Sequence, residues 1–178
     1  MAKRENKSVV EKEGYLYAIP LRAGGFAIAL VVRCGRGKAT LISIFDRSFA
    51  TIPRVEVARP HLSPSRVIHE LRTSPLSIRR GHWPELGQLD EYHRDDWPLP
   101  YWNYPGEYER KPKRGHAFVA RIDECDRVID VKELPVREAA LYDRFGFTGG
   151  DFLERQLTLF FEEGISINAG EVLASYEI

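Results

Sequence analysis

The sequence has few cysteines and no net charge. Only Cys34 and Cys125 occur in 178 residues, so neither a disulfide scaffold nor a zinc knuckle is expected. Lysine and arginine together number 26, and aspartate and glutamate also number 26. This balance removes the usual electrostatic argument for nucleic acid as the main partner, although a local patch can still be charged.

Long apolar runs are also missing. The longest, Phe26–Val32, has seven residues, whereas a membrane-spanning helix needs about 20. The N-terminal residues Lys3, Arg4, Lys7 and Lys12 are charged, but no apolar segment follows them as it would in a signal peptide. We therefore expect a soluble protein of the cytoplasm that does not contact a membrane.

Signatures of metal, phosphate and nucleophile chemistry are absent as well. No histidine pair has a close ligand spacing, and no GxSxG motif occurs, so we predict no catalytic residue, no metal site and no cofactor. Cys34–Lys38 lies between predicted strands and lacks the helix N-terminus that would hold phosphate. The chain has five histidines, His61, His69, His82, His93 and His116, and a metal site assembled in space from His61, His69 or His82 stays open.

The segment from Gly14 to Asp46 organises the rest of the chain. It contains three apolar runs, YLYAIPL, FAIALVV and ATLISIF, which are separated by glycine-bearing turns. Short runs rich in aromatic and β-branched residues with such turns are typical of consecutive β-hairpins. We predict a three-stranded meander, in which the first strand leaves the sheet at Pro20 because proline cannot donate a backbone hydrogen bond.

Further elements follow the meander. Residues 50–58, with Ile52, Val55 and Val57 around Pro53, predict a bent fourth strand. Residues 67–74 fit a strand or a short helix, and we prefer the strand. The sequence then predicts a hairpin over residues 116–134, a short helix over 136–144, and a last strand over 172–178.

The clearest helix signal covers residues 150–162. Its apolar residues recur at three- and four-residue spacing and form one amphipathic stripe. Thr148 is the predicted N-terminal cap, and Gly164 suits the position just past the helix end.

Residues 82–115 differ in composition from the rest. They contain all three tryptophans and many prolines. Dense proline argues against long helices and inner strands, and the large aromatic area argues against simple disorder. The segment is therefore predicted to be an ordered, irregular Trp/Pro-rich wrap.

This wrap carries two charged groups beside aromatic residues. Asp90, Glu91, Asp95 and Asp96 lie next to Trp97, a combination that suits recognition of a basic protein surface. The same residues also fit a solvated surface around a buried tryptophan. Residues 110–114 are basic and follow several tyrosines, but proline, glycine and the zero net charge argue against nucleic-acid binding.

Three motifs in order resemble the immunity protein 26 family of bacterial polymorphic toxin systems. EGYLYAIPL (Glu13–Leu21) is similar to the family's opening strand, and GGFAIALVV is followed by a third strand that ends in Ile44-Phe45-Asp46. HWPELGQL (His82–Leu89), followed by Asp96-Trp97-Pro98, is the third. Ala29 departs from the family, which often has glycine there. The motif residues, which we expect to be structural, are Gly14, Pro20, Leu21, Gly25, Phe26, Phe45, Asp46, Trp83, Pro84 and Gly87.

The resemblance implies an α+β fold with an SH3-like small β-barrel. Residues 1–13 would be a flexible lead-in and residues 14–178 a single domain. That domain would comprise barrel strands over 14–74, the wrap over 82–115, the hairpin over 116–134 and C-terminal helices over 136–162.

The resemblance also implies a protein partner, the cognate toxin, which the chain would bind and neutralise in the cytoplasm of the producing bacterium. The residues expected to contribute to toxin binding are Asp95, Asp96, Trp97, Tyr101 and Trp102. Two alternatives stay open. One is a metal-dependent hydrolase, since the family label is also attached to proteins described as phosphotriesterases. The other is a module that binds nucleic acid through residues 101–114.

Overall fold

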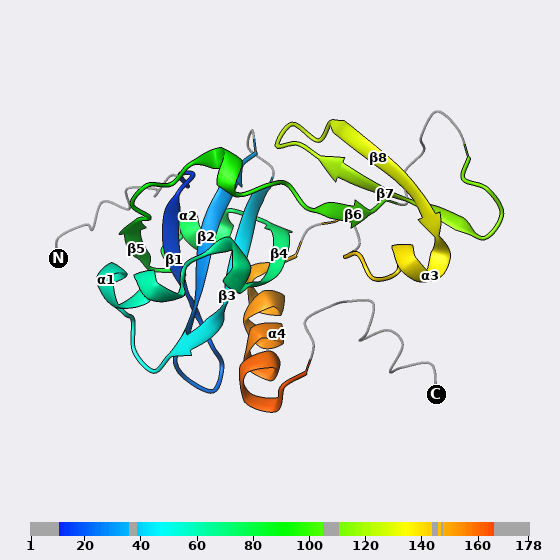
Figure 1. The fold of residues 1–178 in the computed structure, drawn as a ribbon. Coiled ribbons are helices and arrows are strands. Elements are labelled where there is room, and N and C mark those ends of the chain that lie inside the picture. The colour runs from blue at the N-terminus through cyan, green and yellow to red at the C-terminus, as the bar shows by residue number, and fades with distance from the viewer. Residues whose placement is uncertain (1–10, 36–38, 105–110, 144–145, 147, 166–178) are drawn as a thin grey trace.

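The computed structural model describes residues 11–35, 39–104, 111–143, 146 and 148–165. They form an α+β fold with two antiparallel sheets, ordered β4-β3-β2-β1-β5 and β6-β7-β8 (Figure 1). The larger sheet contains β1 (Tyr15–Pro20), β2 (Phe26–Cys34), β3 (Thr40–Phe49), β4 (Val67–Thr73) and β5 (Glu85–Gln88). The smaller contains β6 (Tyr101–Asn103), β7 (His116–Ile122) and β8 (Val128–Pro135). The helices are α1 (Val55–Ala58), α2 (Leu76–Arg79), α3 (Val136–Ala139) and α4 (Gly150–Glu163), with 3-10 helices η1 (Arg59–His61), η2 (Pro64–Arg66) and η3 (Arg94–Asp96).

The predicted meander is confirmed. Strands β1, β2 and β3 are neighbours in the larger sheet and pair in antiparallel fashion. Strand β1 ends at Pro20, which lies opposite Phe26 at the hairpin. Gly25 allows the turn, because its φ is 82° and a Cβ there would lie 2.7 Å from the carbonyl oxygen of Phe49.

The larger sheet does not close into a barrel. In the described part of the chain its edge strands, β4 and β5, do not pair with each other, so the SH3-like barrel is not confirmed.

The strand predicted over residues 50–58 is wrong, because Val55–Ala58 forms α1. Pro53 cannot donate to a strand ladder, and the Arg54 carbonyl accepts hydrogen bonds from the N–H groups of Val57 and Ala58. The preferred strand over residues 67–74 is confirmed as β4, which pairs with β3.

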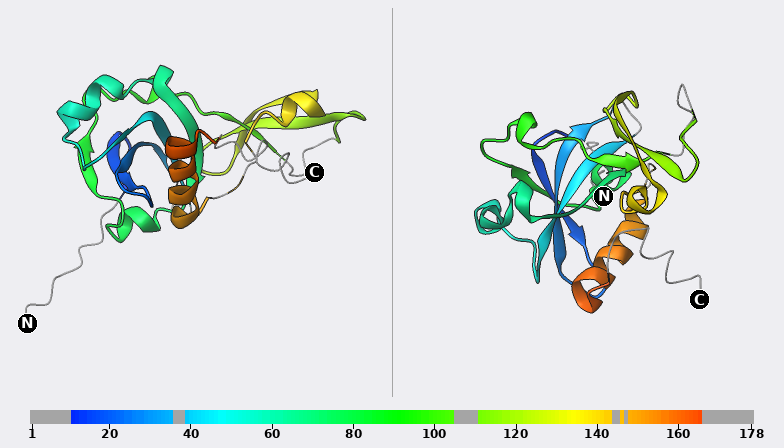
Figure 2. Two further views of the ribbon diagram at one scale, coloured as in Figure 1. Left: turned by 90° about the horizontal axis from the view of Figure 1, so that it is seen from below. Right: turned by 45° about the vertical axis from the view of Figure 1, so that its right-hand side comes forward.

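Helix α4 covers one face of the larger sheet, and both views in Figure 2 show it packed there. Leu153 and Leu157 are fully buried among side chains of β1, β2, β3 and β4. The predicted helix is thus confirmed, and Gly164 ends it with a φ of 67°. The predicted cap Thr148 is wrong, because Gly149 is the N-cap. Thr148 instead forms an isolated β-bridge with Thr73, the last residue of β4.

The wrap and the smaller sheet cover the opposite face. Trp97 and Trp102 share one buried cluster with Phe45, Ala120 and Ile122, so residues of both sheets meet in a common core. The two short strands inside the wrap, β5 and β6, contain no proline and lie at sheet edges. Trp83 is buried on the α4 side, where its Nε1 donates to Glu154 Oε1 at 2.9 Å.

The ends of the other predicted elements differ from expectation. The hairpin over residues 116–134 is confirmed as β7 and β8. The helix predicted over 136–144 is shorter, since α3 ends at Ala139. The strand predicted over 172–178 and residues 1–10 of the predicted lead-in lie outside the described residues. Glu11, at the end of that lead-in, is buried and pairs with Arg79.

Residues of the three motifs that resemble the family make specific structural contacts. Gly14 has a φ of 79°, and a Cβ there would lie 2.8 Å from the Tyr92 ring. Asp46 accepts from Arg66 Nε at 3.0 Å. The carbonyl oxygen of Pro84 accepts from the N–H of Ala18 at 2.9 Å. Leu21, Phe45 and Trp83 are buried, and Gly87 pairs with Leu16.

The packing of α4 predicts a stability difference between two of its positions. Leu157→Ala should lower the free energy of unfolding by about 2–5 kcal/mol, because it leaves a cavity under the helix. Phe152→Ala, on the same helix but at a 57% exposed position, should change it by about 0.5 kcal/mol or less. Urea unfolding curves measure both, and equal losses would contradict this packing.

Candidate functional site

A hollow of about 390 Å³ lies between the η1–η2 segment and the chain that follows β5. We call it the acidic hollow. Its floor is apolar, with Leu62, Leu89 and Trp97, and three of its lining residues carry carboxylates. The lining residues are Arg59, Leu62, Ser63, Pro64, Leu89, Asp90, Glu91, Asp96 and Trp97.

The carboxylates at and beside this hollow differ in whether they form an ion pair. Asp90 forms an ion pair with Arg59. Glu91, Asp95 and Asp96 are exposed, and within the described residues their side chains form neither an ion pair nor a hydrogen bond. Three negative charges therefore face solvent at and beside the hollow.

Arg33 holds the loop that carries these acids. Its side chain is buried at the end of β2. Nη2 donates to the carbonyl oxygens of Arg94 and Trp97, each at 2.9 Å. Nη1 donates to the Val32 carbonyl at 2.7 Å and to the Tyr92 hydroxyl at 3.2 Å. One guanidinium thus fastens both ends of η3, and with it Asp95 and Asp96, to the larger sheet.

A second hollow lies between β4 and β6, and we call it the β4–β6 cleft. Its volume is about 210 Å³. His69 Nδ1 lies 3.2 Å from Asp143 Oδ2, so β4 is linked here to the segment after α3. The lining residues are Val67, Ile68, His69, Glu70, Pro100, Tyr101, Trp102, Leu141, Tyr142 and Asp143.

Burial shifts two titratable groups of the cleft in opposite senses. It lowers the pKa of His69, because desolvation disfavours the imidazolium, and the charge of Asp143 opposes this shift. It raises the pKa of Glu70, and the hydrogen bond from Ser43 and the charge of Arg33 oppose that shift. The structure therefore favours a neutral His69.

The residues predicted to bind toxin are divided between the two hollows. Asp96 and Trp97 line the acidic hollow, with Asp95 exposed beside it, whereas Tyr101 and Trp102 line the cleft. Trp97 and Trp102 are only 4% and 3% exposed, because both pack into the core between the sheets. They lie beneath the surface, and for Trp97 this agrees with the alternative of a solvated acidic surface around a buried tryptophan.

Sequence reasoning missed Arg33, Arg59 and the His69–Asp143 pair. An arginine directly after seven apolar residues was a usable signal, because a charge at the end of a buried strand needs hydrogen-bonding partners. No local pattern indicates that His69 and Asp143 meet, since they belong to different elements far apart in the chain.

No metal-binding group is found in the described part of the chain, where no three His, Cys, Asp or Glu side chains are placed to hold an ion together. Cys34 is partly buried and Cys125 exposed. Burial raises the pKa of the Cys34 thiol to about 12, and the charges of Glu13 and Glu11 add to the shift. None of the described helices has the length and apolar character needed to cross a membrane.

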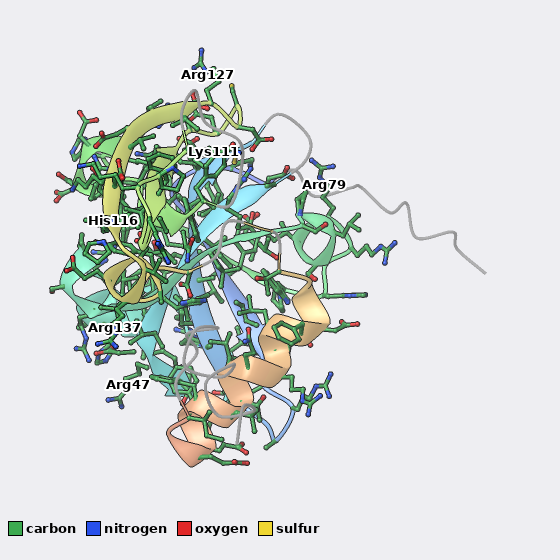
Figure 3. The ribbon with its side chains drawn as sticks, turned by 90° about the vertical axis from the view of Figure 1, so that its right-hand side faces the viewer. Arg47, Arg79, Lys111, His116, Arg127 and Arg137 are labelled. Carbon is green, nitrogen blue, oxygen red and sulfur yellow. The ribbon has the colours of Figure 1, made fainter. Side chains whose placement is uncertain are left out.

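Four basic side chains in and around the smaller sheet lie apart from one another, whereas Arg121 and Lys132 both lie over the partly exposed ring of Tyr101. Figure 3 shows Lys111, His116, Arg127 and Arg137 spread over this side of the molecule. Trp102, one of the aromatic residues considered for base stacking, is buried. A stacking platform needs several exposed rings along a basic groove, and the burial of Trp102 removes one of the rings considered for it.

The Arg33 contacts predict a local loss of stability. Arg33→Lys should lower the free energy of unfolding by about 1–3 kcal/mol, because an ammonium group cannot reach all four acceptors and the hydrogen bonds that fasten η3 are lost. Arg47→Lys, at an exposed position (Figure 3), is the matched control. Amide hydrogen exchange should quicken over residues 92–97 in the first variant alone. Unchanged protection there would contradict the role assigned to Arg33.

The lowered pKa of His69 predicts a pH effect on stability. The unfolded chain binds a proton near the ordinary histidine pKa of about 6.5, and the folded chain does so only at lower pH. Stability from this group is therefore complete above that value and falls as the solution is acidified below it. In His69→Gln the fall between neutral and mildly acidic pH should be smaller, whereas His93→Gln, at an exposed position, should behave like the parent. Thermal unfolding measured across this range tests the difference, and identical profiles for parent and His69→Gln would refute it.

Comparison with known proteins gives one family. The family model for immunity protein 26 matches residues 12–111. This range holds β1 to β6, Arg33 and every residue of the acidic hollow. No curated protein and no solved structure matches the chain significantly. Because the matched range is more than half of the 178 residues, the chain belongs to the immunity protein 26 family.

Proposed function

We propose that this chain is an immunity protein that binds and occludes a cognate toxin in the cytoplasm of the producing bacterium. Family membership supports a role in toxin immunity. The observation that carries the rest is the acidic hollow, in which the exposed carboxylates of Glu91 and Asp96 lie beside the apolar residues Leu62, Leu89 and Trp97. This surface suits a basic patch on the toxin.

The carboxylates supply attraction at a distance. Glu91, Asp95 and Asp96 are exposed, so they remain hydrated before the partner arrives and need not break an existing ion pair to bind. Opposite charges of this kind raise association rates and select against acidic partners. The charge pattern therefore favours a toxin whose active cleft is rimmed by lysine or arginine, as expected of an enzyme that binds a polyanion.

The floor of the hollow supplies short-range contact. Leu62, Leu89 and Trp97 provide apolar area below the carboxylates. Lysine and arginine have apolar stems and charged ends, so one such side chain can cover the floor while its charge meets Asp96 or Glu91. Trp97 is held in place by an edge-to-face contact with Phe45, with ring centroids 5.9 Å apart.

The hollow is also preorganised. Arg33 fixes the η3 backbone before binding, and the floor residues belong to the common core. Ordering a loop upon binding costs free energy, so a loop already ordered leaves more of the contact energy as affinity. A rigid surface of this type needs no chemistry of its own. It neutralises the toxin by covering the cleft, with an affinity of low nanomolar or better, about −12 kcal/mol.

The proposal is tested with the toxin domain encoded beside the gene for this chain. Asp95→Asn with Asp96→Asn should weaken binding about tenfold or more and reduce its dependence on salt, because two favourable charges are lost. The matched control is Glu162→Gln with Glu163→Gln, which removes two exposed charges from α4. Calorimetry at low and moderate salt measures both. An unchanged affinity in the first variant would place the toxin surface away from the acidic hollow.

A further inference from the structure

The β4–β6 cleft has the composition of a receptor for a cation. Its described lining includes two carboxylates, Glu70 and Asp143, and the rings of Tyr101, Trp102 and Tyr142, but no lysine or arginine. Its volume of about 210 Å³ is below the roughly 300–1,000 Å³ of pockets that enclose small-molecule ligands. The space suits one long side chain.

Glu70 has unused capacity to accept hydrogen bonds. Its Oε1 accepts one from Ser43 Oγ at 3.2 Å, and the described residues supply its side chain with no other hydrogen bond or ion pair. A carboxylate offers about four acceptor positions. Desolvation raises the pKa of this carboxyl against the hydrogen bond from Ser43 and the charge of Arg33. A cation that entered the cleft would supply donors for the acceptor positions that Ser43 does not use.

Neighbouring cations restrict where a ligand can lie. The ring of Tyr101 already faces the guanidinium of Arg121 at 4.5 Å and the ammonium of Lys132 at 4.1 Å. The ring of Tyr142 meets Tyr101 edge to face at 6.3 Å, and no described cation lies over it. A positive group is therefore accommodated against the Tyr142 ring, in the cleft whose lining also includes Glu70.

We infer that the β4–β6 cleft binds one arginine side chain of the toxin, as a second contact point beside the acidic hollow. This inference rests on the proposed function. A guanidinium fits better than an ammonium, because its plane can stack on a tyrosine ring while its N–H groups donate to a carboxylate.

The two hollows are close enough for one partner to reach both. Pro64 lines the acidic hollow and Val67 the cleft on one segment, and Trp97 and Pro100 do so on another. Three residues of extended chain span at most about 10 Å. The linings of the two hollows therefore approach each other within about 10 Å along each segment, a distance that two cations on one basic face of the toxin can span.

A model compound tests the cleft without the toxin. N-acetyl-arginine methylamide should bind the full chain with a Kd in the millimolar range and shift the NMR signals of Glu70 and Tyr142. The neutral, similarly shaped N-acetyl-citrulline methylamide should not. Glu70→Gln should weaken arginine binding about tenfold or more, as expected for a lost charge-assisted hydrogen bond. Glu162→Gln, on α4, should leave it unchanged. If Glu70→Gln does not fold, Tyr142→Leu serves instead, with the same expected direction.

Equal binding of the two compounds, binding that survives both cleft substitutions, or no binding in this range would overturn the inference. If the inference holds, the same cleft substitutions should weaken toxin binding both in the parent chain and in the variant with Asp95 and Asp96 replaced. If the chain binds its toxin but not the arginine compound, the inference about the cleft is wrong and the proposed function is unaffected. A chain that binds the compound through Glu70 but no toxin overturns the proposed function.

Discussion

Burial on both faces of the central strands is the constraint on which the rest of the structure depends. Strand β2 has seven consecutive buried residues and β3 has six, whereas an antiparallel sheet with one wet face would alternate. Such strands need a cover on each side. Helix α4 covers one face, and the tryptophan-rich wrap with the smaller sheet covers the other. The segments that shape the acidic hollow and the β4–β6 cleft are therefore parts of the core cover.

Arg33 connects this core to the candidate surface. A buried guanidinium must find acceptors, and it finds them on the loop of η3. The requirement that stabilises the end of β2 thereby orders the loop that carries Asp95 and Asp96. An immunity protein benefits from this arrangement, because a surface that is rigid before binding loses little conformational entropy on meeting its partner.

The parts of the fold that local patterns encode were predictable. The meander, the β7–β8 hairpin and α4 each follow from periodicity and turn residues within a short window. Residues 50–58 misled the prediction because Val55 and Val57 alternate as in a strand, while Pro53 and the backbone of Arg54 start a helix. Closure of a barrel was not predictable, since it depends on whether β4 and β5 meet, and these strands are separated by α2 and a loop.

The candidate site also has features that the sequence predicts and features that it does not. The sequence by itself determined that Asp95 and Asp96 form a charged, solvent-facing group, because carboxylates without a local partner stay in water. It also determined that three tryptophans order the wrap. Only the tertiary structure decided that Trp97 and Trp102 are buried, that Arg33 donates to a carbonyl 64 residues away, and that His69 of β4 meets Asp143 in the segment after α3. The physical reason is that burial and pairing of these side chains depend on which distant segments pack together, and short-range patterns carry no information about that choice.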